Sequence, residues 1–278
     1  MLDEHGRNGL EMSRVPVFQR LIQVSYLVGA AAVVACSAPT MSESEGSTDS
    51  SRADSTSEAL VNTAFWEPLD SFKSNIWQES NWSNGGFFRS AFKPDHVTFL
   101  SGAMTLKLDN VPSSGLAYSG GEYASRDTFA YGKFEANLIA AKCSGTVSSF
   151  FLYTNTPVWD EIDVEFLGKN TSQVQFNYFV NGVGGHEHIH NLGFDASLAY
   201  HKFQIEWGNG WINWWVDGVW AWGVNNTGLN APVGAKLPSH SMKVMANLWA
   251  GVGVDGWLGP FVYSGPVRAK YDYFKYTP

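Results

Sequence analysis

The sequence predicts an all-β fold, an antiparallel β-sandwich, from two observations. From about residue 65 onward, short segments with alternating apolar and polar residues are separated by turns rich in Gly, Asn, Asp and Pro. Alternation of period two is typical of strands that bury one face, and such strands at short spacing are typical of sandwiches. Helical periodicity is absent except for a weak signal over Asp195–Tyr200. The folded part is therefore expected to consist of hairpin-connected strands.

Each expected strand is a short run rich in β-branched and aromatic side chains, which fit a pleated, half-buried surface. Asp217 and Gly218, between two of these runs, form a strong two-residue hairpin signal. A composition that is 44% hydrophobic and 15% aromatic supplies a packed core. In chain order the expected strands are Val97–Leu100, Met104–Leu108, Tyr131–Leu138, Val147–Tyr153, Glu161–Phe166, Val174–Phe179, Lys202–Trp207, Trp211–Val216, Val219–Trp222, Met242–Leu248 and Ala269–Tyr276.

One folded domain is expected at residues 65–278, behind two segments without a fold of their own. Residues 1–35 have the features of an export signal, because basic residues precede an apolar run shorter than the roughly 20 residues that span a bilayer. Three acids before residue 12 are unusual in such a signal, so Met12 is an alternative start. Residues 36–64 are rich in Ser, Thr, Glu and Asp, which predicts a disordered tether.

Cys36 follows small residues at the end of the apolar run and resembles the lipidated cysteine of bacterial lipoproteins. We therefore predict an exported cell-envelope lipoprotein that is held to the membrane by a lipid anchor on Cys36. Ser37, in place of Asp, favours the outer membrane or cell surface if the source is Gram-negative. Cys143 is the only other cysteine, so no intrachain disulfide is expected if Cys36 is lipidated.

The charge of the chain argues against one class of partner. The formal net charge is −8 and no basic patch is present, so nucleic-acid binding is not expected. The 12 Trp, 11 Tyr and 18 Phe suit a sandwich core, and they also suit stacking on the flat apolar faces of sugars. A neutral polysaccharide is thus a compatible ligand, and we expect the protein to be a monomer.

Three acids, Glu161, Asp163 and Glu165, alternate with apolar residues in the segment 159–168. A strand would place all three carboxyls on one face, whereas a helix would turn Asp163 away from the other two. Like charges packed together raise at least one pKa toward neutrality while another group stays ionised. This arrangement suits the acid and the nucleophile of a glycosidase. A solvated acidic strand face is the alternative.

The segments 159–169 and 174–187 resemble glycoside hydrolase family sixteen, and within it the bacterial lichenase-type endo-β-1,3-1,4-glucanases. Shorter stretches at 192–195, 214–218 and 247–251 extend the likeness over most of the domain. The resemblance implies a concanavalin A-like jelly roll. It also implies a retaining glycoside hydrolase that acts by double displacement.

Carried over by position, the family's nucleophile falls on Glu161, its acid/base on Glu165 and its assisting carboxyl on Asp163. Straight-strand geometry would place the Cα atoms of Glu161 and Glu165 about 13 Å apart. The carboxyl gap of roughly 5 Å in a retaining enzyme would then require curvature and converging side chains. The resemblance, and not the spacing, therefore implies retention.

The resemblance also implies a set of substrate contacts, in which aromatic rings stack on glucose and polar groups bind hydroxyls. Phe151 and Trp249 have a structural alternative as core residues, and Glu122 has one as a surface carboxylate. Ala124 replaces an Arg of the lichenases and Phe179 replaces a Tyr, changes that bear on the substrate more than on the chemistry. The implied contacts are Glu122, Phe151, Tyr153, Trp159, Asn177, Trp249 and Trp257.

Gly102 and Asp272 lie where the family holds a structural calcium ion, partly through backbone oxygens. The resemblance makes them candidate calcium ligands, although no cofactor is expected to be required for the reaction. The alternating His186, His188 and His190 form a weaker metal signal.

Together these observations predict a retaining endo-β-glucanase that hydrolyses β-1,3-1,4-glucan or a related polysaccharide. Two alternatives stay open. One is a transglycosylase of the same family that acts on β-glucan or xyloglucan, and the other is a non-catalytic, lectin-like glycan-binding protein. The presence of Glu161, Asp163 and Glu165 together argues against the lectin.

Overall fold

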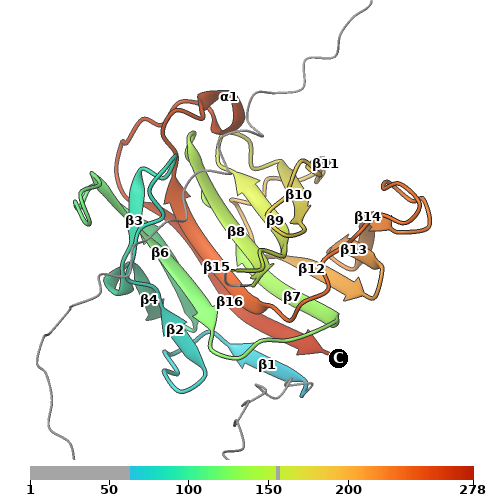
Figure 1. Ribbon diagram of the computed structural model, residues 1–278. Coiled ribbons are helices and arrows are strands. Elements are labelled where there is room, and N and C mark those ends of the chain that lie inside the picture. The colour runs from blue at the N-terminus through green and yellow to red at the C-terminus, as the bar shows by residue number, and fades with distance from the viewer. Residues whose placement is uncertain (1–62, 155–156) are drawn as a thin grey trace, which may run out of the picture.

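Two β-sheets, packed face to face, form the protein (Figure 1). The computed structural model describes residues 63–154 and 157–278. The expected export signal, Cys36 and nearly all of the tether therefore lie outside the described residues. Within the described residues, no helix has the length and apolar character needed to pass through a bilayer. The predicted all-β sandwich is confirmed.

Sheet A contains β1 (Phe65–Pro68), β4 (Val97–Leu100), β5 (Ala103–Leu108), β7 (Gly132–Ile139), β12 (His201–Gly208), β13 (Trp211–Val216), β14 (Val219–Asn225) and β16 (Val267–Thr277). Its strand order is β14-β13-β12-β7-β16-β5-β4, and β1 also pairs with β16. All of these pairs are antiparallel.

Sheet B contains β2 (Trp77–Glu79), β3 (Ser90–Phe92), β6 (Tyr118–Ser125), β8 (Thr146–Tyr153), β9 (Glu161–Leu167), β10 (Gln173–Phe179), β11 (His188–Asn191) and β15 (Lys243–Ala250). Its strand order is β11-β10-β9-β8-β15-β6-β2, and β3 pairs with β6 in parallel. A 3-10 turn, η3 (Pro94–His96), and one helical turn, α1 (Asp255–Leu258), lie outside the sheets.

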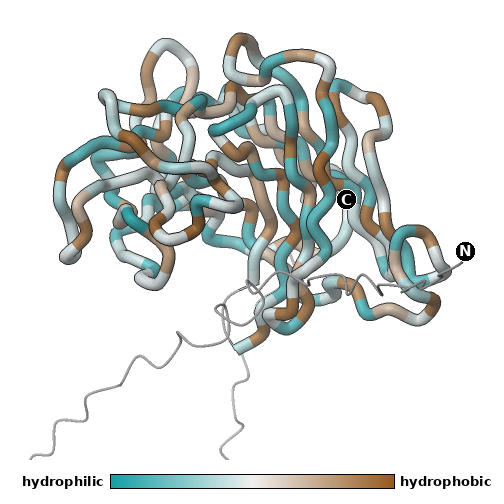
Figure 2. Tube along the Cα trace, turned by 90° about the horizontal axis from the view of Figure 1, so that it is seen from above, coloured by the Kyte–Doolittle hydropathy of each residue, from teal (hydrophilic) through white to brown (hydrophobic). Residues whose placement is uncertain are grey.

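The core lies between the sheets and is rich in large aromatic side chains. Phe166 of β9 meets Phe203 of β12 edge to face at 4.8 Å between ring centroids. Phe176 of β10 stacks on Trp214 of β13 at 5.5 Å. Hydropathy alternates along many of the strands (Figure 2). The side chains that alternate with these core aromatics therefore point out of the sandwich. Those of β9 lie on the outer face of sheet B, and those of β13 lie on the outer face of sheet A.

Every expected strand is present, with ends that differ by a few residues. Five further strands, β1, β2, β3, β6 and β11, were not predicted. The longest is β6, which is rich in Gly and Ser and almost continuously buried, so it shows no alternation. The helical signal over Asp195–Tyr200 is wrong. That segment is a turn, in which the Asp195 carboxylate accepts hydrogen bonds from the backbone N–H and the hydroxyl of Ser197.

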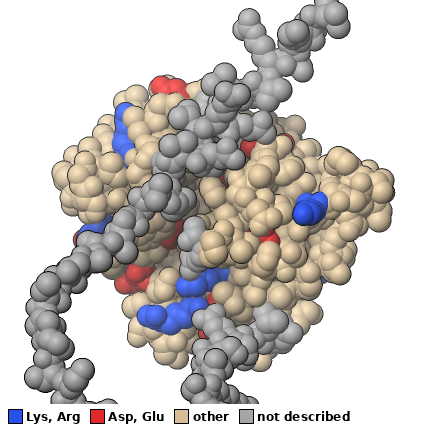
Figure 3. Space-filling model, in the orientation of Figure 1, with Lys and Arg blue, Asp and Glu red and all other residues tan. Residues whose placement is uncertain are grey.

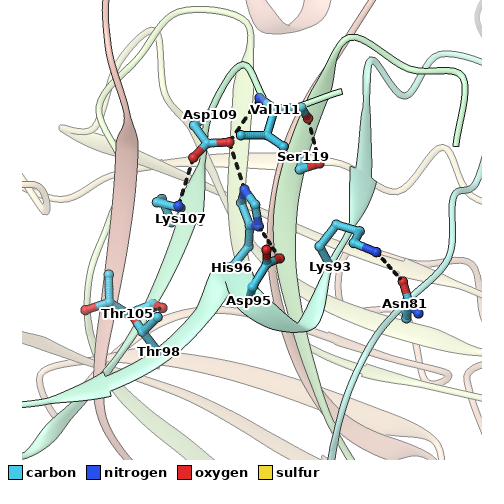
Figure 4. Close-up of polar contacts among 10 residues, drawn as sticks. All are labelled: Asn81, Lys93, Asp95, His96, Thr98, Thr105, Lys107, Asp109, Val111 and Ser119. Atoms are coloured by element: carbon cyan, nitrogen blue, oxygen red, sulfur yellow. Dashed lines mark hydrogen bonds and ion pairs between the residues drawn. The ribbon is translucent and has the colours of Figure 1, made fainter. Parts of the chain in front are cut away.

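A buried imidazole ties the start of β4 to the end of β5 (Figure 4). The two ring nitrogens of His96 lie 2.8 Å from an oxygen of Asp95 and 2.8 Å from an oxygen of Asp109. Each nitrogen lies within donating distance of a carboxylate oxygen, and an ionised carboxylate can only accept. Asp109 also pairs with Lys107 at 2.8 Å and accepts the backbone N–H of Val111 at 3.2 Å. Asp109 is thus the central acceptor of this cluster.

Asp109→Asn is expected to lower the free energy of unfolding by about 1–3 kcal/mol at neutral pH, because buried donors lose a charged acceptor. Burial alone would raise the pKa of Asp109, but hydrogen bonds from His96 and Lys107 outweigh it and hold that pKa below its usual value. The stabilisation is therefore present above the unfolded pKa and is lost as the pH falls through the folded pKa.

Urea unfolding of both proteins at neutral and acidic pH measures this effect, and the two stabilities should converge in acid. Asp95→Asn is the matched control, because the Asp95 carboxylate is 74% exposed and solvent screens its ion pair. Equal losses in the two variants at neutral pH would contradict the central role of Asp109.

Candidate active site

β9 places Glu161, Asp163 and Glu165 on the face of sheet B that points away from the core, here called the site face. The apolar residues that alternate with them are completely buried in the core. Because successive side chains of a strand point to opposite faces, the three carboxyls share the other face. The predicted strand is confirmed, and the helical alternative is wrong.

Cross-strand register extends the site face into rows, because residues opposite one another in antiparallel strands share a face. The row of Asp163 runs through Asn177, Phe151, Met245 and Ala124. The row of Glu165 runs through Gln175, Ser149, Asn247 and Glu122, and that of Glu161 through Phe179, Tyr153 and Lys243. Four of the predicted substrate contacts, Glu122, Phe151, Tyr153 and Asn177, therefore lie in the same rows as the acids.

An indole holds Glu161. Nε1 of Trp159 donates to Oε2 of Glu161 at 2.6 Å. The Trp159 ring stacks on Phe179, the cross-strand partner of Glu161, at 5.4 Å and 13°. The carboxyl of Asp163 forms a second hydrogen bond with Glu161. Stacking on Phe179 thus holds the Trp159 ring in place, and the Trp159 ring holds Glu161.

A two-step hydrogen-bond relay holds Glu165. Nε2 of Gln175 donates to Oε2 of Glu165 at 2.7 Å, and Oε1 of Gln175 accepts from Nε1 of Trp257 at 3.1 Å. Since an indole can only donate, Trp257 determines which end of the amide carries the oxygen and leaves the NH₂ for Glu165. The role of Gln175 was not predicted. Its signal is its place on the strand next to the acids, in phase with Asn177.

Asp163 lies between the two glutamates and is only 2% exposed. Nε1 of Trp214 donates to its backbone oxygen at 2.9 Å, which anchors β9 to the core. Among the described residues, Oδ2 of Asp163 has no hydrogen-bond partner. An unpaired buried acceptor is costly, so this oxygen is suited to hold a proton or to meet a sugar hydroxyl.

The three carboxyls cannot all be ionised at neutral pH. Burial is the largest cause in each case, and it raises the pKa of Glu161 to about 7 and that of Glu165 to about 8. The charge of Glu161 further raises the pKa of Glu165, and both glutamates raise the pKa of Asp163. The titration belongs to the group as a whole. A protonated carboxyl beside an ionised one is what the acid and the nucleophile of a glycosidase require.

Glu122 is a buried acceptor at one end of the site face. Its Oε1 accepts from Oγ of Ser80 at 2.7 Å and from Nε1 of Trp82 at 3.1 Å. Its Oε2 accepts from Nδ2 of Asn247 at 3.4 Å, and Oδ1 of Asn247 accepts from Oγ of Ser149 at 2.6 Å. Burial raises the pKa of Glu122 against these hydrogen bonds. The structural alternative, a surface carboxylate, is therefore wrong.

Phe151 lies on the site face and not in the core between the sheets. It packs with Met245 and Ala124 in a separate small apolar cluster, and Tyr153 lies against that cluster. Asn177 lies opposite Asp163 on β10, and its Oδ1 accepts the N–H of the next residue. The cluster gives this row an apolar floor next to Asp163.

Trp249 also lies outside the main core. It is buried in a second cluster, where its ring centroid is 4.2 Å from that of Phe88, 5.7 Å from that of Phe87 and 6.0 Å from that of Trp257. Register places Trp249 one row beyond Glu165 on the site face. Phe151 and Trp249 are therefore buried, as the core alternative expected, but they lie outside the main core between the sheets.

Asp160 has a positioning role that was not predicted. Its buried Oδ2 accepts from Nδ1 of His240 at 2.8 Å and from the backbone N–H of Ser239 at 2.9 Å, while its Oδ1 accepts from the N–H of Asn181 at 3.1 Å. Burial alone would raise the pKa of Asp160, but these hydrogen bonds outweigh it and keep that pKa low. The sequence signal is its phase, because Asp160 is in phase with the core-facing Ile162, Val164 and Phe166, where an unpaired acid is not tolerated.

The predicted calcium ligands lie in sheet A. Gly102 is in the turn between β4 and β5, with φ of +78°, and Asp272 is in the bulge of β16. Oδ2 of Asp272 accepts from Nδ2 of Asn137 at 3.0 Å, and its backbone oxygen accepts from the N–H of Leu69 at 3.0 Å. These oxygens are of the type that calcium prefers, but each already accepts a hydrogen bond. Calcium binding at Gly102 and Asp272 stays a prediction.

The alternating histidines pack on aromatic rings. His186 stacks on Tyr178 at 3.9 Å, and His188 stacks on Trp222 at 4.5 Å. His190 lies 6.4 Å from His188 between ring centroids. Over 63–154 and 157–278, no group of three His, Cys, Asp or Glu side chains is placed to hold a metal ion. The weak metal signal therefore finds no support in these residues.

Comparisons with known proteins agree with this geometry. A family model described as glycosyl hydrolases family 16 matches residues 74–274. A beta-glucanase of Acetivibrio thermocellus is 45% identical over 79% of this chain. This chain spans 64% of the length of that relative, which is less than two thirds. A beta-glucanase of Paenibacillus polymyxa is 44% identical over 79% of this chain and 90% of its own.

A solved structure shows the same fold. It is a prokaryotic beta-1,3-1,4-glucanase (lichenase) derived from a mouse hindgut metagenome, with a TM-score of 0.72 and 40% identity. The likeness covers 78% of this chain and 99% of that one. The expected jelly-roll sandwich is thereby confirmed.

Asp160→Asn is expected to lower kcat about tenfold with a smaller change in KM, because the loops beside Glu161 lose their common acceptor and Glu161 and Trp159 shift. It is also expected to cost about 1–3 kcal/mol of stability, since buried N–H groups lose a charged partner. Steady-state kinetics and urea unfolding measure the two effects.

His240→Ala is the matched control, because it removes one side-chain donor and leaves the backbone donors in place. It should change kcat by a smaller factor. A kcat in Asp160→Asn equal to that of the wild type would contradict the positioning role of Asp160.

Proposed function

We propose that this chain, which belongs to the glycosyl hydrolases family 16, is an endo-β-glucanase that cleaves β-1,3-1,4-glucan with retention of configuration. The observation that carries the proposal is the group of three carboxyls on β9, with Asp163 buried and the two glutamates half-buried, in which desolvation and mutual repulsion keep a proton at neutral pH. The names of the relatives support the substrate, since two are beta-glucanases and one solved structure is a lichenase.

In the proposed first step, the ionised carboxylate of Glu161 attacks the anomeric carbon as the bond to the leaving oxygen breaks. Glu165 gives its proton to that oxygen, and a covalent glycosyl-enzyme remains. In the second step, Glu165 takes a proton from water. The water oxygen then attacks the anomeric carbon and releases Glu161. Two inversions at one carbon give net retention.

The neighbouring groups divide the two roles. Trp159 donates to Glu161 and so favours its ionised form, which a nucleophile needs. The negative charge of Glu161 raises the pKa of Glu165 and so favours its protonated form, which an acid needs. Asp163 hydrogen-bonds Glu161 and faces both glutamates, so its proton can balance the charge that changes during the two steps.

The residues around the carboxyls support an uncharged sugar chain as ligand. The floor beside Asp163 is apolar, formed by Phe151, Met245 and Ala124. Glu122 and Asn247 offer hydrogen-bonding groups at one end. On the side of the molecule seen in Figure 3, charged side chains are few and lie in small separate groups. A neutral glucan therefore fits these surroundings better than a charged polysaccharide.

Release of reducing ends from barley glucan, lichenan, laminarin and xyloglucan tests the proposal. Wild type is expected to release them from barley glucan and lichenan, and Glu165→Gln to be slower by a factor of about 10²–10⁴. Glu161→Ala should be inactive. Proton NMR of the earliest products should show the β anomer.

Each alternative has its own outcome. Longer products without new reducing ends would identify a transglycosylase, and binding without product a lectin. An initial α anomer would contradict the double displacement. A wild type inactive on every substrate of the panel would overturn the proposal.

The pH profile of kcat/KM is expected to be bell-shaped. Activity falls in acid as Glu161, with its pKa raised to about 7, takes up a proton. It falls in base as Glu165, with its pKa raised to about 8, loses one. Glu165→Gln should lose the alkaline limb when assayed on an aryl glycoside whose leaving group needs no protonation. An alkaline limb that persists unchanged in this variant would contradict the acid role of Glu165.

Export and anchoring complete the proposed function. A secreted or surface enzyme would meet a polysaccharide too large to enter the cell, and lipidation of Cys36 would hold a monomer at the envelope. Mass analysis of the mature N-terminus tests this, with a diacylglyceryl modification expected on Cys36. An unmodified chain that begins upstream of Cys36 would overturn it.

A further inference from the structure

One continuous cross-strand row crosses the outer face of sheet A, the face that points away from the core. Register sets its members opposite one another from β14 to β1. They are Trp220, Trp215, Gln204, Glu135, Lys275 and Trp66. The row is aromatic at both ends and polar in the middle.

The row lies on the opposite side of the sandwich from the acids. Trp214 is buried in the core and donates to the backbone of Asp163 in sheet B. Trp215, its neighbour on β13, therefore points away from sheet B. One stretch of sugar chain cannot contact both Trp215 and the site face.

Hydrogen bonds fix the indoles at the β14 end. Nε1 of Trp220 donates to Oδ1 of Asn213 at 3.1 Å, and Nε1 of Trp215 donates to Oε2 of Glu206 at 3.0 Å. Trp220 is nevertheless 47% exposed. An exposed ring that is already held in place loses little conformational entropy when a ligand stacks on it.

The second exposed aromatic side chain of the row lies at the β1 end. Trp66 is 61% exposed, and its ring lies 6.1 Å from that of Tyr273. The hydroxyl of Tyr273 donates to Oε1 of Glu135, and Nε2 of Gln204 donates to Oε2 of Glu135 at 2.7 Å. Amide, hydroxyl and carboxylate groups thus lie between the aromatic ends.

Charges of both signs lie in and beside the row. Lys275 lies opposite Glu135 in the register, and Nζ of Lys133 lies 3.7 Å from Oε1 of Glu206. Nζ of Lys133 also lies 5.8 Å from the ring of Trp215. Charges of both signs along the row favour neither a polyanion nor a polycation as its ligand.

We propose that this row is a second binding site for a neutral polysaccharide chain, separate from the catalytic carboxyls. Flat apolar sugar faces stack on Trp220, Trp215 and Trp66, and hydroxyls pair with Gln204 and Glu135. The choice of β-glucan as ligand rests on the proposed function. The site would hold a long chain while another part of the same polymer enters the active site, which raises the local concentration of cleavable bonds.

The test uses two row variants, Trp215→Ala/Trp220→Ala and Trp66→Ala, in the full chain. Trp211→Ala is the matched control, because Trp211 is 37% exposed on the same face of β13 but four residues away from the row. Affinity electrophoresis in barley glucan measures polymer binding with Glu161→Ala as the inactive background. KM and kcat are measured on the polymer and on a short oligosaccharide with Glu161 intact.

The double variant is expected to bind the polymer about tenfold more weakly, as the loss of two stacking rings implies. Its KM on the polymer should rise, with kcat and the oligosaccharide kinetics unchanged. Trp66→Ala should weaken binding by a smaller factor, and Trp211→Ala should not. Because Trp66 is the most exposed ring, its variant keeps the test valid if the double variant does not fold.

Four outcomes would overturn the inference. They are unchanged polymer binding in both row variants, an equal loss in Trp211→Ala, an equal loss of activity on the oligosaccharide, or sedimentation that shows the row joining two copies of the chain. These differ from failure of the proposed function, in which the wild type would cleave none of the glucans.

Discussion

Three carboxyls packed on one face of β9, with Asp163 buried and Glu161 and Glu165 half-buried, are the constraint on which the rest of the site depends. Burial and mutual repulsion disfavour their charged forms, so Glu161, Asp163 and Glu165 share protons at a pH where ordinary carboxyls would be bare. Packing like charges together costs stability, and the packing of the sandwich core offsets that cost. The apolar side chains that alternate with the acids fill the core and hold the strand in phase.

Each of the two glutamates has a neighbour that is itself fixed. Trp159 holds Glu161 and is stacked on Phe179, while Gln175 holds Glu165 and is oriented by Trp257. The hydrogen bonds that these neighbours make set the position of an acid more narrowly than the strand alone could. Asp160 contrasts with the group, because several N–H donors keep it ionised and it serves structure instead of chemistry.

Much of the fold could be predicted because alternation of period two is a local property. β9 and the ten other expected strands show this alternation clearly. β6 does not, because it is covered on both faces, and β1, β2, β3 and β11 are too short to show it. The sequence of the Asp195 turn resembled a helix start, because Asp195 accepts a hydrogen bond from the backbone N–H of Ser197 as a helix-capping acid would.

Within the site, the shared strand face of the acids could be predicted from their spacing, while the substrate contacts that the family resemblance implies stay predictions. The roles of Gln175, Asp160 and His240 could not be predicted, since they depend on register and loop contacts between distant parts of the chain. The row on sheet A could not be predicted for the same reason. Trp66 and Trp220 are far apart in the chain, and only strand order brings them into one line.

The most direct test of the central claim is a titration of the glutamate carboxyls by carbon-13 NMR. Two side chains, Glu161 and Glu165, are expected to titrate near 7 and 8. The higher value should fall in Glu161→Gln, because the charge that raises the pKa of Glu165 is gone. Titration of both glutamates near the ordinary value of about 4.3, or an unchanged Glu165 in the variant, would contradict the account.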